Sequence, residues 1–120
     1  MAKKVAINYH TEHSDPFWVT FACRFKHKAV DDASLSLMRQ ETKEKLDLLC
    51  NAFDLSESRE ATYGYQQDAF GYPSLTSLFY LDAGPITVLE FFHLYQALTS
   101  FITMLPKNRK AEISLKYHCH

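Results

Sequence analysis

Residues 17–26 read Phe-Trp-Val-Thr-Phe-Ala-Cys-Arg-Phe-Lys, and this stretch decides the fold. Large apolar side chains occupy every second position, which is the side-chain period of a β-strand. The pattern predicts a strand with one face in a hydrophobic core and the other face left to polar groups and one indole. The core face would carry Phe17, Val19, Phe21, Cys23 and Phe25, and the opposite face Trp18, Thr20, Ala22, Arg24 and Lys26.

Segments on either side of this strand extend the pattern. Residues 4–10 also alternate and are joined to it by a short turn cluster, so we expect an antiparallel hairpin. Downstream, apolar residues recur at helical spacing over about residues 32–53, and Asp31 or Asp32 is suited to cap the start of that helix.

The second half of the chain repeats this alternation of strand and helix. A short strand is predicted near residues 60–66 and a buried strand at 75–81, which ends in a turn at residues 82–85. A helix then runs from about Pro85 to Leu105, because proline suits the first helical position. Residues 113–119 alternate again and form the last strand.

Together these elements define an α+β fold in the order β-β-α-(β)-β-α-β. We expect a two-layer sandwich, in which two helices pack on one face of a mainly antiparallel sheet. From the second strand onward the order is that of a ferredoxin-like core. With 120 residues, the chain has the length of one α+β domain spanning residues 1–120.

Composition limits the compartment and the chemistry. Three cysteines without a Cys-x-x-Cys spacing argue against a disulfide framework or a zinc site, and no signal peptide is visible, so a reducing, cytoplasmic location is expected. The apolar segment 86–105 contains Glu90 and His93, which makes a buried helix a better interpretation than a membrane span. Neither a nucleophile motif nor a phosphate-binding glycine loop occurs, so we expect no catalysis and no cofactor.

The charges are unevenly spread, although the net charge is only −1. Residues 1–30 carry five basic and two acidic side chains, residues 31–68 four basic and nine acidic, and residues 105–120 four basic and one acidic. Basic ends and an acidic middle are typical of a chain that meets charged partners.

The leading functional hypothesis is a small module that binds a partner protein and acts by occupying it, as inhibitors, immunity proteins and antagonists do. Tyrosine-rich loops provide large contact area, and an acidic stretch attracts a basic partner. The predicted partner-binding residues are Tyr63, Tyr65, Phe70, Tyr72, Asp54 and Glu57. The helix at 85–105 is apolar on nearly all sides and needs a second covering surface, which either the first helix or a second subunit in a homodimer could supply.

Two alternatives remain open. Basic groups around an exposed aromatic ring are used by proteins that bind single-stranded nucleic acid, and here they would be Trp18, Arg24, Lys26 and Lys116. A metal-dependent activity would instead need convergent imidazoles, for which the candidates are His10, His118 and His120.

Overall fold

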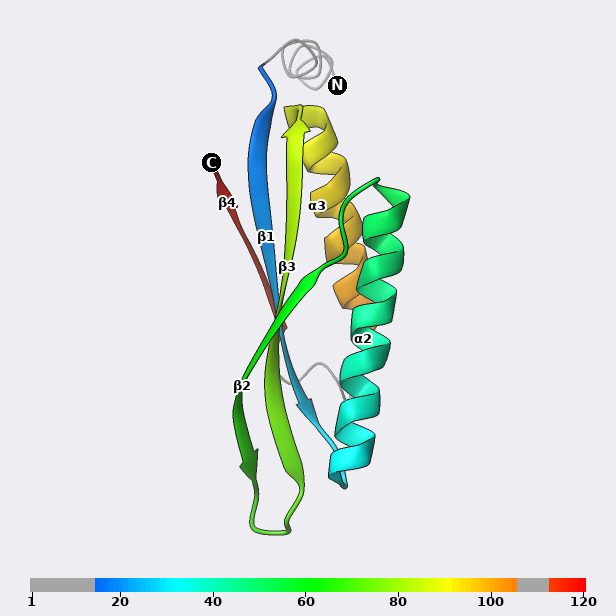
Figure 1. Cartoon of the computed structure of the whole chain (residues 1–120), viewed down its shortest axis with the longest axis vertical. Coiled ribbons are helices and arrows are strands. Elements are labelled where there is room, and N and C mark those ends of the chain that lie inside the picture. Colours follow the sequence, from blue (N-terminus) through cyan, green and yellow to red (C-terminus); the bar gives the residue numbers. More distant parts are fainter. Residues whose placement is uncertain (1–14, 106–112) are drawn as a thin grey trace.

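The computed structural model describes residues 15–105 and 113–120, and these form one open four-stranded sheet with two helices on one of its faces (Figure 1). The strand order is β2-β3-β1-β4, and every neighbouring pair is antiparallel. The elements are β1 (Phe17–Lys28), α2 (Asp32–Ala52), β2 (Arg59–Gln67), β3 (Pro73–Ile86), α3 (Val88–Thr103) and β4 (Ile113–Cys119).

The α+β two-layer architecture predicted from the sequence is confirmed. From β1 onward the elements follow the order β-α-β-β-α-β with β1 and β3 at the centre of the sheet, which is the arrangement of ferredoxin-like folds. The strand predicted at residues 4–10 lies outside the described residues. The hairpin expected between it and β1 has no free edge to use from Val19 to Phe25, because β4 pairs there on one side and β3 on the other.

Alternation along β1 places the core as the sequence predicts. Val19, Phe21, Cys23 and Phe25 are each at most 1% exposed and face the helices. They lie opposite inward residues of β3, such as Leu81, so the two central strands share one apolar surface. Each fully buried aromatic or leucine side chain contributes roughly 2–3 kcal/mol of transfer free energy, which makes this surface the main source of stability.

β3 corrects the sequence prediction at residues 82–85. The strand does not end in a turn there, because Asp82 pairs with Thr20 and Ala83 with Val19. Pro85 falls at an irregularity in the ladder, one of the places where a sheet tolerates proline.

Helix α3 begins at Val88 and not at Pro85. Thr87 is its N-cap: its hydroxyl accepts a bond from the Glu90 N–H at 3.2 Å, and the Glu90 carboxylate accepts from the Thr87 N–H at 2.8 Å. This capping box satisfies two of the free donors at the helix start, so the helix begins where its caps are.

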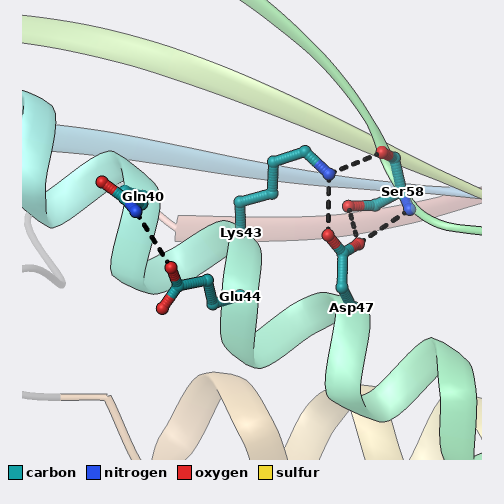
Figure 2. Close-up of polar contacts among 5 residues, drawn as sticks. All are labelled: Gln40, Lys43, Glu44, Asp47 and Ser58. Carbon is teal, nitrogen blue, oxygen red and sulfur yellow. Dashed lines mark hydrogen bonds and ion pairs between the residues drawn. The ribbon is translucent and has the colours of Figure 1, made fainter.

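A partly buried cluster of polar groups holds the connection between α2 and β2 in place (Figure 2). The Asp47 carboxylate accepts hydrogen bonds from the Ser58 N–H at 2.9 Å and the Ser58 hydroxyl at 2.7 Å. The Lys43 ammonium donates to Asp47 at 2.7 Å and to the Ser58 carbonyl at 3.1 Å. Asp47 therefore anchors the strand that follows and is not a free surface acid.

Replacing Asp47 with Asn should lower the free energy of unfolding by about 1–2 kcal/mol at pH 7, because the ion pair with Lys43 is lost. Burial raises the pKa of Asp47, but hydrogen bonds from Lys43 and Ser58 outweigh this and leave the pKa below its usual value. The stabilisation by this carboxylate is therefore present above the unfolded-state pKa of about 4 and is lost as pH falls through the folded-state pKa.

Urea unfolding at pH 7 and at about pH 2–3 measures this difference, which should shrink at the lower pH. The matched control is Glu44→Gln, since Glu44 accepts one bond from the exposed Gln40 at 3.0 Å (Figure 2). An Asp47→Asn variant as stable as the wild type at pH 7 would show that the cluster does not anchor β2.

Candidate functional site

One face of the sheet is turned away from the helices, and we call it the open face (Figure 1). Strand register determines which side chains it carries, because residues paired directly across an antiparallel ladder project to the same side. These are Trp18, Thr20, Ala22, Arg24, Lys26 and Lys28 of β1, Ser74, Thr76, Leu78, Tyr80 and Asp82 of β3, Arg59, Ala61, Tyr63 and Gln66 of β2, and Ser114, Lys116 and His118 of β4.

The structure brings together the four residues that the sequence suggested for nucleic-acid binding. Trp18, Arg24 and Lys26 lie along β1 on this face, and Lys116 lies across from Ala22 on the neighbouring β4. Their side chains therefore belong to one surface that two adjacent strands support.

Trp18 is held on this face by a close approach to β3. Its side chain is 55% exposed, and it lies so near Gly84 that a Cβ at that position would be 2.6 Å from the indole ring. Only glycine leaves room for the ring there, and its φ of 153° also lies in a region that other residues rarely adopt. Sequence reasoning took Gly84 for a turn residue and missed its role in seating the indole.

Two further aromatic rings lie on the open face beside cations. The Arg59 guanidinium is 5.2 Å from the centre of the Tyr80 ring and forms an ion pair with Asp82 at 2.9 Å. Arg24 donates from Nε to the Tyr63 hydroxyl at 2.9 Å. Sequence reasoning missed Arg59 and Tyr80 as site residues, because their meeting depends on the register between β2 and β3.

Charge on the open face has the opposite sign to that of the whole chain. Five cations project from it, on β1, β2 and β4, against a single carboxylate, Asp82. Lys28, at the end of β1, forms an ion pair with Asp68 of the β2–β3 turn at 2.7 Å. Within residues 15–105 and 113–120, neither Lys26 nor Lys116 forms an ion pair. The result is a cationic surface that carries aromatic rings.

The histidine set proposed for a metal is only partly described. His118 and His120 have ring centres 5.0 Å apart, and the His120 Nε2 is 2.9 Å from the Thr20 hydroxyl oxygen. His10 lies outside the described residues. No group of three or more histidine, cysteine or acidic side chains is placed to hold a metal ion within the part of the chain that the structure describes.

The tyrosine-rich segment is divided between two surfaces. Tyr63 belongs to the open face, whereas Tyr65, Phe70 and Tyr72 lie at the end of β2 and in its turn to β3. Phe70 is 82% exposed, and its ring centre is 6.1 Å from that of Tyr72.

The acidic residues predicted to act with these rings lie elsewhere. The Tyr65 hydroxyl donates to Asp32 at 2.8 Å, which places this end of the sheet beside the start of α2. Asp54 and Glu57 follow the other end of α2. Because α2 has 21 residues, its two ends are roughly 30 Å apart. Figure 1 shows the β2–β3 turn and the start of α2 toward the lower end of the molecule, and the end of α2 in its upper half. The structure therefore does not bring the predicted aromatic and acidic groups into one site.

Within residues 15–105 and 113–120, helix α3 is covered along one side. Phe91, Leu94 and Leu98 are buried against the sheet, while Phe92 remains 52% exposed and Tyr95 37% exposed. None of the described helices combines the length and the apolar character needed to cross a membrane.

Comparison with known proteins adds no assignment to this geometry. Neither a protein-family model, nor a curated protein, nor a solved structure matches the chain.

Replacing Gly84 with Ala should displace the Trp18 ring, because the added methyl group overlaps the indole. We expect a loss of about 1–3 kcal/mol in the free energy of unfolding and a shift in the emission of this single tryptophan. Gly71→Ala is the matched control: Gly71 also has a positive φ, of 82°, but nothing lies within 4 Å of its added Cβ. Equal losses in the two variants, with unchanged emission, would contradict the proposed seat for Trp18.

Proposed function

We propose that the protein binds single-stranded nucleic acid on the open face, without catalysis. The observation that carries this proposal is the composition of that face, where five cations and the rings of Trp18, Tyr63 and Tyr80 accompany one carboxylate in a chain whose net charge is −1. Nucleic acid matches both features, because its phosphates need cations and its bases offer flat surfaces for stacking.

The arrangement along the face suits an extended strand. Trp18 lies near one end of β1 and Arg24 and Lys26 lie toward the other. Tyr80 and Lys116 lie across from Ala22, between them, so rings and cations are distributed along the length of the face. Stacking a base on an exposed ring contributes about 1–3 kcal/mol, and each neutralised phosphate adds an electrostatic contribution that weakens with salt. Exposed rings of this kind select unpaired bases, since the bases of a duplex are already stacked on each other.

The two buried cysteines, Cys23 and Cys50, are unsuited to covalent chemistry. Burial raises the pKa of Cys23 to about 12 and that of Cys50 to about 11, so both remain protonated thiols at neutral pH. A thiol is far less nucleophilic than a thiolate, so neither residue is suited to attack a substrate. Three free cysteines are also compatible with a reducing cytoplasm, which stays part of the proposal.

Titration of a labelled single strand at several salt concentrations tests the proposal. The logarithm of the binding constant should fall against the logarithm of salt concentration with a slope steeper than about −2, the value for three neutralised phosphates. Lys26→Gln and Lys116→Gln should each make the slope shallower by about 0.7, and Trp18→Ala should weaken binding roughly 5- to 100-fold.

The matched control is Lys45→Gln, which removes the same charge from the exposed side of α2. An affinity that does not depend on salt, or an equal loss for Lys45→Gln and Lys26→Gln, would exclude the open face as the binding surface.

A protein-binding function is the second candidate. It is favoured by several exposed apolar side chains at and near the β2–β3 turn. Phe70 at 82%, Val30 at 67% and Leu37 at 56% exposure lie near this end of the molecule, where Val30, Met38 and Tyr72 line a shallow depression. Exposed apolar patches often mark protein contacts. This version of the inhibitor-like hypothesis uses the turn and the start of α2, and it leaves out Asp54 and Glu57.

Co-purification of the tagged chain from its native host tests the second candidate. A stoichiometric protein partner should no longer co-purify with the Phe70→Ala and Tyr72→Ala variants. It should still co-purify with Leu48→Ala, the control, which removes an exposed apolar side chain elsewhere on α2. A partner that survives both turn substitutions would place the contact on a different surface.

A further inference from the structure

The two edges of the sheet differ in regularity. β2 pairs with β3 through an irregularity between Tyr63 and Gln66, and Gly64 within it has a φ of 72°. Such bulges protect an edge from pairing with other chains. β4 pairs with β1 in unbroken register over its seven residues and contains no proline. Of the two edges, β4 is therefore the one prepared to accept another strand.

The ladder shows which groups of β4 point outward. The His120 N–H donates to the Trp18 carbonyl at 2.8 Å, so these two residues form a hydrogen-bonded pair. Hydrogen-bonded and non-bonded pairs alternate along an antiparallel ladder. The backbone groups of the intervening residues therefore face the outer edge, where no described residue pairs with them; these are Ile113, Leu115, Tyr117 and Cys119.

An aromatic group lies beside this edge on the helix side of the sheet. Tyr117 is 52% exposed, and its ring centre is 5.0 Å from that of Phe91 and 5.9 Å from that of Tyr95. Phe92, which is 52% exposed, contacts Phe91 edge-on. A row of backbone donors and acceptors thus lies next to exposed rings, and an antiparallel copy of the same edge is complementary to both.

We propose that β4 pairs with β4 of a second copy of the chain and forms a symmetric dimer with one continuous eight-stranded sheet. Charge disfavours one of the symmetric registers. A two-fold axis at Lys116 would place two ammonium groups directly opposite each other, which is unfavourable. An axis at Tyr117 pairs Tyr117 with its own copy and places Lys116 opposite the His118 of the other copy.

The sequence suggested a homodimer through the helix that is now α3. In the dimer proposed here the edge strand β4 forms the interface, and α3 contributes Phe92 and Tyr95 at its margin. A two-fold axis perpendicular to the sheet keeps both pairs of helices on one side, so the two open faces also join. The inference does not depend on nucleic-acid binding, because it rests on the edge and the rings.

Sedimentation velocity over a range of concentrations, with nuclease-treated protein and a thiol reductant, tests the dimer. We expect a dimer for the wild type and a monomer for Tyr117→Glu, which places two carboxylates at the axis. Cys119→Pro is a second variant, since it removes an outward N–H and leaves the bonded pairs with β1 unchanged. Lys26→Gln, on the inner strand β1, is the control that should remain dimeric while binding nucleic acid more weakly.

A spin label on Cys119, the one exposed cysteine, gives a direct readout. The proposed register separates the two labelled backbone positions by about 14 Å along the strands. A wild-type monomer at every concentration, a dimer that needs a disulfide, or a dimer unchanged in both Tyr117→Glu and Cys119→Pro would overturn the inference, whatever the outcome for nucleic acid. Circular dichroism of the monomeric variants separates loss of pairing from loss of fold.

Discussion

The pairing of β1 with β3 is the constraint on which the rest of the structure depends. Side chains alternate between the two faces of a strand, so this one register sends Phe21 and Leu81 into the core and Arg24 and Leu78 to the open face. A slip of one residue would exchange the two sets and bury cations. The apolar surface that fixes the fold and the cationic surface proposed to bind a ligand are therefore two consequences of the same ladder.

The sequence was sufficient to predict structure where apolar and polar residues follow one clear period. The alternation at residues 17–26 and 113–119 predicted the faces of β1 and β4, and Asp31 was one of the two caps expected for α2. The turn expected at Gly84-Pro85 was wrong, because pairing with β1 carries β3 through residues that usually end a strand. The meeting of Arg59 with Tyr80 and the separation of Asp54 from Tyr72 depend on strand register and helix length, which local composition does not report.

Acidic and basic side chains are separated between the two layers, so the net charge of the chain does not indicate the charge of either surface. Carboxylates are concentrated on α2 and the segment after it, and several are committed to internal bonds, as Asp31 and Asp47 are. Among the described residues, Lys28, Arg59 and Lys116 are exposed cations of the opposite layer. A polyanion approaching the molecule would be repelled by one layer and attracted by the other. The electrostatic field of the protein would therefore orient the two molecules before they touch.

The weak burial of β2 has a consequence for motion. All of its residues except Glu60 are exposed, so the strand is held by its ladder to β3 and by polar contacts, and not by apolar burial. Segments with few buried apolar contacts open locally at a lower free energy than the core, and their amides exchange with solvent sooner. The half of the open face with Arg59 and Tyr63 is therefore the adaptable half, while the half on β1 keeps its shape as a rigid template.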